Sequence, residues 1–482
     1  MLQKNTFYIT VPIFYPNANL HLGHAYTTTL ADVLARYSRL AGKETYFLTG
    51  SDENAEKVAK AAKKATKETK EYLDEISENF KRLFADLDIS YDQFIRTSDE
   101  KAHWPGAVEF WKKLASAGDI EKRSYEGLYC VGHEAFVMEK DLIDGKCPDH
   151  NEEPQVVKEE NYFFKLSKYT LKIKEKIESG ELKIIPETRR NEIVALLERG
   201  LEDVSFSRPS DKVSVGIPVP DDPSQKMYVW CDALVNYVSA LGFGREDRAL
   251  YDKFWPADVH VIGKDILRFH AAIWPGMLLS VGLPLPRAIL VHGFITSGGK
   301  KMSKTLGNVI DPKTLIDEYG AEAVRYYLAR HISPFEDGDI TLEKFKEAYN
   351  ADLANGIGNL VSRVMKMAEQ YNPNTANEYA DTANKYKFPK EYIKAMDEYN
   401  IKKVADIVWE HISKTDQKIQ ETEPFKLVKS EPEKAKRIIA ELVVGVYEIA
   451  EMLSPILPET SEKIKDLVRS NKSPAEPLFP RK

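Results

Sequence analysis

Short apolar runs alternate with amphipathic stretches in the first part of the chain. The apolar runs at residues 7–11 and 45–49 each end at a turn residue, Pro12 and Gly50, and they predict two strands. Between them, apolar residues at helical spacing over 30–37 predict a helix. A strand, a helix and a second strand in this order are typical of a parallel α/β sheet, whose sites lie at the carboxyl ends of the strands.

The pattern changes twice further along the chain. From about residue 116 to 219, short segments rich in turn residues predict an insertion between two halves of the sheet. The sheet is predicted to resume with strands at residues 227–230, 259–263 and 288–291. Beyond about residue 350 the sequence holds amphipathic helical stretches punctuated by prolines, which predicts a separate all-helical domain.

Length and composition narrow the class of protein. At 482 residues the chain predicts roughly three domains of ~100 to 200 residues each. A net charge of −7 argues against a surface that binds nucleic acid non-specifically, so an RNA partner must meet local basic patches. Three cysteines exclude a disulfide framework, and no leader before Phe7 and no membrane-spanning apolar run is recognised. We therefore expect a cytoplasmic protein that does not bind membranes.

Two short motifs each follow a predicted strand and indicate phosphate chemistry. The His-Leu-Gly-His motif at residues 21–24 places two imidazoles at a helix start, where backbone N–H groups and the helix dipole attract phosphate. The Lys-Met-Ser-Lys-Thr motif at residues 301–305 places two lysines on a loop that follows glycines, which suits the neutralisation of a triphosphate. Either motif alone is weak evidence, but both together, in this order, predict an ATP-activating site.

These motifs resemble the His-x-Gly-His signature and the Lys-Met-Ser-Lys-Ser loop of class I aminoacyl-tRNA synthetases, with Thr305 keeping the hydroxyl of the last position. Within that class the chain is similar to the methionyl-tRNA synthetase family over essentially its whole length. Residues 230–237 resemble the family's Trp-x-Asp-Ala segment, and residues 262–270 resemble its second substrate strand and helix.

The resemblance implies a fold and its domain limits. We expect an α/β protein with a Rossmann-like parallel-sheet catalytic domain, an inserted connective domain with a zinc knuckle, and an all-α anticodon-binding domain. The expected limits are 1–115 and 226–290 for the two catalytic halves, 116–225 for the insertion, 291–349 for the Lys-Met-Ser-Lys loop and tRNA-stem region, and 350–482 for the anticodon domain.

The resemblance also implies the reaction of a methionine–tRNA ligase. L-methionine reacts with ATP to give methionyl-adenylate and pyrophosphate, and methionine then passes to the 3′-terminal adenosine of tRNA(Met). Because the carboxylate of the amino acid attacks the α-phosphorus in line, the protein positions reactants and neutralises charge, and Mg²⁺ on the phosphates is expected. The expected catalytic residues are His21, His24, Lys301 and Lys304, and the expected ATP contacts are Gly23, Gly263, Asp265, Ser303 and Thr305.

A pocket for methionine must use shape and contacts between aromatic rings and sulfur, and each such contact is worth ~0.3 to 1.5 kcal/mol. Phe269 adds an aromatic ring to those of the expected pocket. Asp52, at a strand end, is placed to pair with the substrate ammonium. Ordinary core packing is the alternative for each aromatic residue. Asn54 and Leu234 depart from the histidine and proline of many relatives. By analogy with the family, the methionine-binding residues are Ile13, Tyr15, Asp52, Trp230, Ala233, Tyr237, Ile266 and His270.

Four side chains in the predicted insertion have the spacing of a structural zinc site. Cys130 and His133 form one Cys-x-x-His pair, and Cys147 and His150 form the other. We expect these residues to bind Zn²⁺, and the alternative is a decayed knuckle with two ordinary cysteines. The insertion is too short for the hydrolytic editing domain of leucyl, isoleucyl and valyl enzymes, which supports methionine as the substrate.

Three residues of the predicted helical domain are expected to contact the tRNA anticodon. Asn359 and Arg363 lie four residues apart on one helix face, and Phe425 follows Pro424 where the family has tryptophan. Phenylalanine can still stack on an unpaired base, although it lacks the indole N–H. A solvated helix pair and a core residue are the alternatives. The chain ends without the appended domain that dimerises longer family members, which predicts a monomer.

Two other functions remain open from the sequence. The first is another class I synthetase or a smaller nucleotidyltransferase that uses the same histidine motif. Nucleotidyltransferases lack a helical anticodon domain, and cysteinyl enzymes place zinc at the amino-acid pocket, where this chain has only Cys231. The second is a catalytically silent tRNA-binding paralogue. Such a protein has no need of converging phosphate ligands, which this chain keeps at His21, His24, Lys301 and Lys304, beside Asp52.

Overall fold

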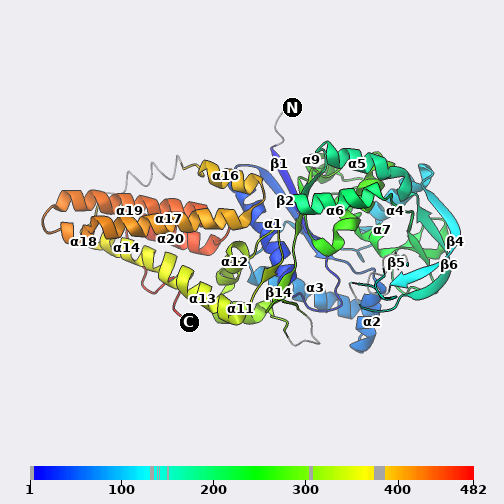
Figure 1. The fold of residues 1–482 in the computed structure, drawn as a ribbon, viewed down its shortest axis with the longest axis horizontal. Helices are drawn as coiled ribbons and strands as arrows, with labels where there is room; N and C mark the ends of the chain where they lie inside the picture. Colours follow the sequence, from blue (N-terminus) through cyan, green and yellow to red (C-terminus); the bar gives the residue numbers. More distant parts are fainter. Residues whose placement is uncertain are drawn as a thin grey trace. The chain divides into compact units, whose positions relative to one another are not determined.

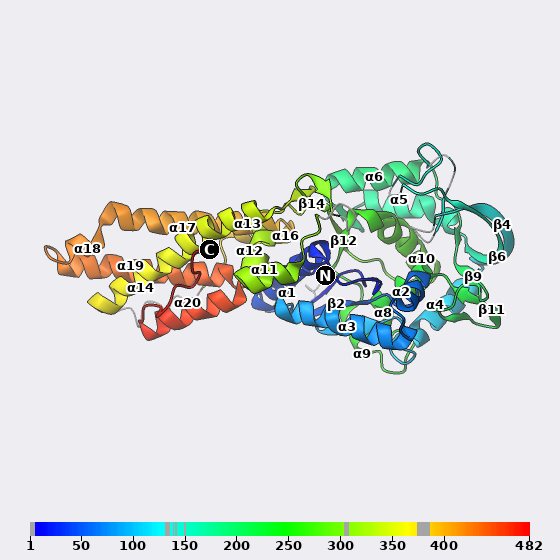
Figure 2. The same cartoon turned by 90° about the horizontal axis from the view of Figure 1, so that it is seen from below.

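The computed structural model describes residues 5–130, 135–137, 139, 142–148, 151–302, 308–373 and 386–482. Its contacts divide the chain into two compact units, and Figures 1 and 2 label the elements of both. Unit 1 holds Met1–Asn19, Tyr46–Phe80 and Tyr91–Val291, and unit 2 holds Leu20–Thr45, Lys81–Ser90 and His292–Lys482.

Unit 1 is built on a six-stranded sheet with the strand order β3-β2-β1-β12-β13-β7. β1 pairs in parallel with β12, β2 with β3, and β13 with β7, which confirms the predicted parallel sheet. The first residues of β2 and the last residue of β13 belong to unit 2. The strands are β1 (Thr6–Thr10), β2 (Glu44–Ser51), β3 (Gln93–Arg96), β7 (Lys183–Ile185), β12 (Val259–Gly263) and β13 (Ala288–His292).

Four of the five strands predicted from apolar runs occur as strands of this sheet. β12 is buried from Val259 to Ile262, and every residue of β13 is buried. Strands covered on both faces carry such continuous apolar runs, which is why the pattern was informative. The carboxyl ends of β2, β1 and β12 meet at one edge because these strands are neighbours in the sheet.

The prediction of a main-sheet strand at residues 227–230 is wrong. Met227 ends a strand of a separate small sheet, and a helix, Val229–Ala233, follows it. The carbonyl of Tyr228 accepts hydrogen bonds from the backbone N–H groups of Cys231 and Asp232, which turns the chain into that helix. A short buried apolar run fits either a strand or a helix, and periodicity alone does not separate them.

The segment interpreted as an insertion forms antiparallel sheets, but one of its strands joins the main sheet. Lys183–Ile185 is β7, which pairs with Ala288–Leu290 at the edge of the six-stranded sheet. The small sheets have the orders β5-β4-β6-β8 and β10-β11-β9. Their strands are β4 (Ile120–Cys130), β5 (Ala135–Val137), β6 (Gln155–Phe164), β8 (Val204–Ser205), β9 (Ser207–Pro209), β10 (Pro218–Val219) and β11 (Asp222–Met227).

Helices connect the strands of unit 1, and α3 ends in unit 2. The α-helices are α2 (Glu56–Lys64), α3 (Thr69–Asp86), α4 (Trp104–Ser116), α5 (Thr170–Glu178), α6 (Glu187–Glu198), α7 (Val229–Ala233), α8 (Asn236–Ser239), α9 (Ala249–Phe254) and α10 (Trp274–Ser280). The 3₁₀-helices are η2 (Leu166–Tyr169) and η3 (Lys264–Ile266), and a π-helix, η4 (Phe269–Ile273), leads into α10.

Unit 2 contains the predicted first helix, α1 (Leu22–Leu40), and a small sheet of β15, β14 and β16. The strands are β14 (Ile295–Ser297), β15 (Lys300–Lys301) and β16 (Gly338–Asp339), and the helices from α11 to η5 are α11 (Pro312–Tyr319), α12 (Ala321–Arg330), α13 (Leu342–Ala348) and the π-helix η5 (Tyr349–Gly358).

The predicted helical region beyond residue 350 is confirmed in the part of it that the structure describes. α17 packs on α19, and α14 and α20 also pack on α19, so these helices run side by side (Figures 1 and 2). In the described ranges no helix combines the length and the apolar character needed to cross a bilayer. The helices are α14 (Asn359–Tyr371), α16 (Lys390–Asp397), α17 (Ile401–Thr422), α18 (Pro424–Leu427), α19 (Pro432–Leu453) and α20 (Pro458–Ser470).

Candidate active site

The two histidines of the His-Leu-Gly-His motif cap α1 through each other. His21 is the N-cap residue, and its Nδ1 accepts a hydrogen bond of 3.0 Å from the backbone N–H of Gly23. The backbone N–H of His21 donates in turn to Nδ1 of His24 at 3.1 Å. This reciprocal arrangement is a capping box made of imidazoles. Since both Nδ1 atoms accept, each neutral ring carries its proton on Nε2.

Glycine between these histidines is required by space. A Cβ atom on Gly23 would lie 2.9 Å from Cε1 of His21, so any side chain would displace the ring. The rings of His21 and His24 lie 3.9 Å apart. Burial, followed by the neighbouring His21 and His292, lowers the pKa of His24 well below its usual value. His24 is therefore a neutral N–H donor at pH 7, and a helix start with such donors suits an anion.

A second contact holds the first turns of α1 against the end of β13 within unit 2. Nε2 of His292 lies 2.7 Å from the hydroxyl of Thr27, and Nδ1 of His292 lies 2.7 Å from the carbonyl oxygen of Gly293. The carbonyl can only accept, so Nδ1 carries the proton and Nε2 accepts from the threonine hydroxyl. Burial lowers the pKa of His292 to about 4, which keeps this ring neutral.

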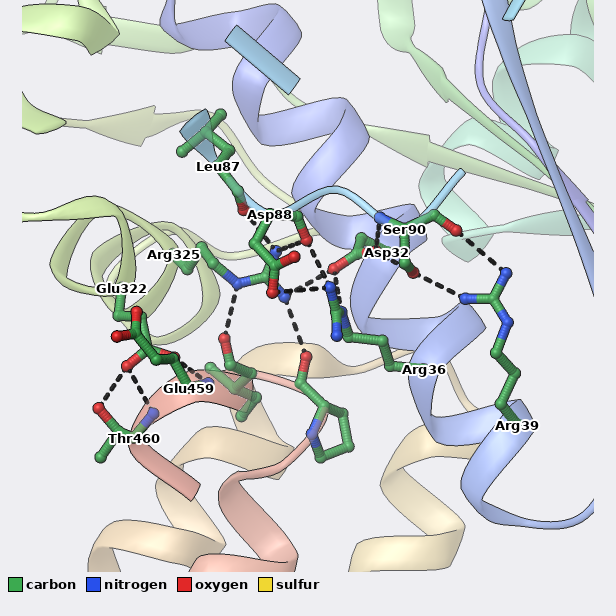
Figure 3. A network of polar contacts seen from close by, with 12 residues as sticks. Asp32, Arg36, Arg39, Leu87, Asp88, Ser90, Glu322, Arg325, Glu459 and Thr460 are labelled. Carbon is green, nitrogen blue, oxygen red and sulfur yellow. Dashed lines mark hydrogen bonds and ion pairs between the residues drawn. The ribbon is translucent and has the colours of Figure 1, made fainter. Parts of the chain in front are cut away.

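The middle of α1 is held by a buried ion pair, drawn in Figure 3. Arg325 of α12 and Asp32 of α1 are both fully buried and lie 2.7 Å apart. Burial alone would raise the pKa of Asp32, but the charges of Arg325 and Arg36 and hydrogen bonds from Ser90 lower it below its usual value. The aspartate is therefore ionised inside the protein.

The remaining donors of Arg325 bind backbone carbonyls from two other segments. Its guanidinium donates to Leu87 at 3.0 Å, Ile456 at 2.9 Å and Pro455 at 3.1 Å (Figure 3). Pro455 and Ile456 form the turn between α19 and α20. The Arg325 side chain thus fixes α1 to the turn after α3 and to the turn between α19 and α20, all within unit 2.

The lysine motif begins in a tight hairpin. β14 and β15 pair antiparallel, and Gly298 and Gly299 between them have φ angles of +62° and +73°, which a two-residue hairpin turn of this type requires. Asp339 of β16 accepts a 2.7 Å hydrogen bond from the backbone N–H of Gly299. Lys301 lies in β15, but its side chain and Ser303, Lys304 and Thr305 lie outside the described residues. Their expected phosphate contacts stay predictions.

In unit 1, Tyr237 and His270 of the expected methionine pocket form a buried neutral pair. Nδ1 of His270 donates to the carbonyl of Ile266 at 3.0 Å, so its Nε2 accepts from the Tyr237 hydroxyl at 2.7 Å. Burial lowers the pKa of His270 to about 4. Burial also raises the pKa of Tyr237, and the charge of nearby Asp52 adds to that effect. The pair offers polar atoms without a charge.

Two stacked aromatic rings lie beside this pair. The indole of Trp230 stacks on Phe269 with ring centroids 3.8 Å apart and planes inclined by 12°. The same indole meets His270 edge to face at 6.2 Å. Tyr237 and Ala233 are buried, whereas Trp230, Phe269 and Ile266 are partly exposed. The structure therefore brings together Trp230, Tyr237, Ile266 and His270, and the stacked Phe269 belongs with them.

The loops after β1 and β2 place the other expected pocket residues next to each other. The backbone N–H of Asp52 donates to the carbonyl of Phe14 at 2.9 Å, which sets the buried Asp52 beside Ile13 and Tyr15. Gly50 permits this close packing, because a Cβ there would lie 2.9 Å from Cγ2 of Ile13 and 2.1 Å from the carbonyl oxygen of Ile95. The expected pairing of Asp52 with the substrate ammonium stays a prediction.

The expected ATP residues of unit 1 lie at the end of the neighbouring strand. Gly263 is the last residue of β12, and Asp265 follows in η3 with an exposed side chain. Because β12 pairs with β1, these residues share the sheet edge of Ile13 and Tyr15. Their contact with ATP stays a prediction, although an open position at a strand's carboxyl end is usual for nucleotide sites.

Only half of the expected zinc site falls within the described residues. Cys130 and Cys147 are both buried, while His133 and His150 lie outside the described residues. Among the residues that the structure describes, no group of three or more histidine, cysteine, aspartate or glutamate side chains is arranged to hold a metal ion. Zinc binding therefore stays a prediction from the sequence spacing.

The expected anticodon residues lie on α14 and α18 of unit 2. Asn359 begins α14 with an exposed side chain, and Arg363, one turn further on, forms an ion pair with Asp416 of α17. The Phe425 side chain is 42% exposed, so the core alternative for this residue does not hold. An exposed aromatic ring suits stacking on a base. The contacts of all three residues with tRNA stay predictions.

Sequence reasoning missed several residues that build these sites. Asp32 and Arg325 stand 293 positions apart, and nothing in the local pattern links them. His103, Asp232 and Ser239 form a buried cluster behind Trp230 that the sequence also did not indicate. A charged residue at a position that helical spacing places in the core is the signal that could have suggested Asp32.

Comparison with known proteins gives a consistent result. A family model described as tRNA synthetases class I (M) matches residues 7–156 and 139–365. The methionine–tRNA ligase of Clostridium acetobutylicum is 43% identical over 478 residues, which span 96% of this chain and 73% of that protein. The methionine–tRNA ligase of Thermotoga maritima is 42% identical over 484 residues, spanning 98% of this chain and 76% of that protein.

Solved structures agree with these relatives. The structure of Mycobacterium tuberculosis methionyl-tRNA synthetase in complex with methionyl-adenylate superposes with a TM-score of 0.89 at 35% identity. The match covers 99% of this chain and 100% of that one. The chain belongs to the methionyl-tRNA synthetase family of class I aminoacyl-tRNA synthetases, which makes it an ATP-dependent ligase.

Proposed function

We propose that this ligase activates L-methionine with ATP and transfers it to tRNA(Met). The first step gives methionyl-adenylate and pyrophosphate, and the second esterifies the 3′-terminal adenosine of the tRNA. The observation that carries the proposal is the neutral Tyr237–His270 pair beside the stacked rings of Trp230 and Phe269. Such a surface is polarizable and uncharged, which matches a thioether side chain.

Each part of the chain has a task in the first step. The Asp52 carboxylate binds the ammonium group of methionine, and the aromatic surface orients its side chain. His21 and His24 donate from Nε2 to phosphate oxygens, because their Nδ1 atoms are held by the cap of α1. Lys301 and Lys304 neutralise the charge that develops on pyrophosphate. The Mg²⁺ that accompanies ATP supplies further charge neutralisation at the phosphates.

Neither step requires a protein nucleophile. The methionine carboxylate attacks the α-phosphorus, the bond to pyrophosphate breaks, and the adenylate later passes its acyl group to the tRNA hydroxyl with release of AMP. The protein's contribution is orientation and charge stabilisation, which together account for most of the barrier reduction in such reactions. Cys231 of α7 is buried and is not needed for either step.

The tRNA is proposed to be read at its anticodon by the helical bundle. Phe425 stacks on an unpaired base, while Asn359 and Arg363 contact base edges from α14. The exposure of Phe425 supports this role, and the ion pair with Asp416 orients the guanidinium of Arg363. The reaction is proposed to take place in the cytoplasm. The protein is proposed to act as a monomer, and light scattering of the purified chain measures its oligomeric state.

ATP–pyrophosphate exchange measured with each of the twenty standard amino acids in turn tests the proposal. Exchange is expected with methionine and with no other standard amino acid. The Tyr237→Phe variant removes the donor that Nε2 of His270 needs, and we expect the KM for methionine to rise about 3- to 10-fold, as the loss of one hydrogen bond predicts. Preference for methionine over norleucine, which lacks the sulfur, falls with it. Exchange driven by a different amino acid would refute the assignment.

Zinc binding is a separate proposal with its own measurement. Cys130 is the last residue of β4 and lies opposite Ala135 of β5, and the carbonyl of Cys147 accepts from the backbone N–H of Asn151. Both cysteines are buried, and thiolates and imidazoles are the usual donors of a structural zinc site. When bound, the ion would join the two Cys-x-x-His segments.

Metal analysis by mass spectrometry is expected to find stoichiometric Zn²⁺ in the purified protein. Cys147→Ser is expected to lose the metal and to lower the melting temperature, because structural zinc contributes directly to folding. Cys231→Ser, which changes a buried cysteine of α7, is the matched control and keeps the metal. Zinc-free protein with an unchanged melting temperature after chelation would contradict the proposal.

A further inference from the structure

A buried polar cluster lies directly behind the Trp230 segment in unit 1. Asp232 of α7 is fully buried, two residues from Trp230 and next to Ala233. One of its carboxylate oxygens binds Nε2 of His103, which is also fully buried. The other oxygen accepts a 2.6 Å hydrogen bond from the side-chain amide of Asn54. Two donors from distant segments thus hold one carboxylate in the interior.

The protonation of this cluster follows from its partners. Asp232 can only accept when ionised, so Nε2 of His103 carries the proton that joins them. Nδ1 of His103 lies 2.8 Å from the hydroxyl of Ser239, another fully buried residue. Ser239 belongs to α8, the helix of Tyr237, so His103 contacts both α7 and α8. Gly106 keeps this approach close, because a Cβ there would lie 2.5 Å from Cβ of Ser239.

Asn54 connects the cluster to the loop that carries Asp52. Its amide nitrogen donates both to Asp232 and, at 3.0 Å, to the carbonyl of Thr97. The hydroxyl of Thr97 accepts from the backbone N–H of Glu53 at 2.7 Å, which secures the same loop again. Both amide hydrogens of Asn54 are therefore used, one on each side. The loop that carries Asp52 and the α7 residue Asp232 therefore meet at the Asn54 side chain.

We propose that His103 and Asn54 are positioning residues that set the affinity for methionine by clamping Asp232. Both side chains are buried, and both act through the backbone of Asp52 and of Trp230 to Tyr237. The inference rests on the proposed function, because it concerns the same amino-acid site. It also gives a task to Asn54, the residue that departs from the histidine of many relatives.

A purely structural cluster and a positioning cluster differ in what they do to kinetics. Loss of a positioning contact shifts the KM for methionine while the KM for ATP stays constant, since the clamp lies on the amino-acid side. Loss of a structural contact lowers stability and affects both substrates alike, or neither. A separate buried carboxylate, Asp119, provides the comparison, because it is bound by Ser280 and Lys168 elsewhere in unit 1.

The experiment measures ATP–pyrophosphate exchange with methionine and ATP varied in turn, together with methionine affinity by calorimetry. Asn54→Ala and His103→Leu are expected to raise the KM for methionine about 10-fold or more, as leaving a buried charge without one donor predicts, with the KM for ATP within about twofold. His103→Gln, which keeps a donor near the position of Nε2, restores most of the affinity. Asp119→Asn lowers the melting temperature without changing the KM for methionine.

The outcomes separate the two levels of the proposal. Wild-type protein that shows no methionine-dependent exchange would overturn the proposed function itself. Folded Asn54→Ala protein with unchanged methionine affinity, or a parallel rise in both KM values, would overturn the positioning role alone. Should His103→Leu fail to fold, the Asn54→Ala variant decides, because that change removes one amide and leaves the His103 contacts in place.

Discussion

His24→Asn is expected to lower the rate of methionine-dependent ATP–pyrophosphate exchange by about 10²- to 10³-fold, the usual cost of removing one preorganised donor from a site of developing charge. The asparagine oxygen lies near the position of Nδ1, so it can still accept from the backbone N–H of His21 and preserve the cap. No donor remains at the position of Nε2. The melting temperature is therefore expected to stay unchanged while activity falls.

His24→Gln is the matched variant. Its amide nitrogen reaches the position of Nε2 and can still donate to phosphate, but it satisfies the cap less well. Gln is thus expected to retain more activity than Asn and to lose more stability. The rate of ATP–pyrophosphate exchange and the melting temperature of both variants check that the more active variant is the less stable one. Equal activity of the Asn variant and the wild type would show that Nε2 of His24 donates nothing to the reaction.

Arg325→Met is expected to lower the free energy of unfolding by about 3 to 5 kcal/mol, as for other buried ion pairs that lose one partner. The substitution leaves the ionised Asp32 without the nearer of its two arginine partners and removes the donors of three backbone carbonyls. Each of those carbonyls is buried beside the guanidinium, so water does not replace the lost bonds. Urea denaturation of the full chain measures the change.

Two further variants show which part of the side chain matters. Arg36→Met also removes a contact with Asp32, but the Arg36 side chain is partly exposed, so a smaller loss is expected. Arg325→Lys keeps the charge but lacks the planar set of donors of a guanidinium. Its free energy of unfolding should lie between those of the wild type and of Arg325→Met. A loss below about 1 kcal/mol in Arg325→Met would mean that the segments are held by other contacts, since exposed pairs contribute that little.

The sequence predicted the parts of the fold that depend on local pattern. The strands of residues 7–11, 259–263 and 288–291 occur because continuous apolar runs were enough to mark buried strands. Residues 227–230 failed because the same composition suits a short buried helix, and the choice was made by contacts of the Tyr228 carbonyl. β7 could not be recognised, because three residues carry too little pattern to show which sheet they join.

The candidate site divides in the same way. Tyr237, His270 and Trp230 could be named from their types and from the family resemblance, but not the tautomer of His270, which the Ile266 carbonyl fixes. Asp232 stands 129 positions from His103 and 178 from Asn54. Contacts between such distant residues follow from the assembled fold, so no local spacing could have indicated this cluster.

The placement of β7 limits how this enzyme can be shortened. The connective segment resembles a removable insertion, yet Lys183–Ile185 within it completes the edge of the main sheet beside β13. Excising the whole segment would expose the backbone of Ala288–Leu290, an apolar strand without charges at its edge, and such edges recruit strands from other molecules. A trimmed variant must keep or replace this strand, or it will aggregate before its chemistry can be assayed.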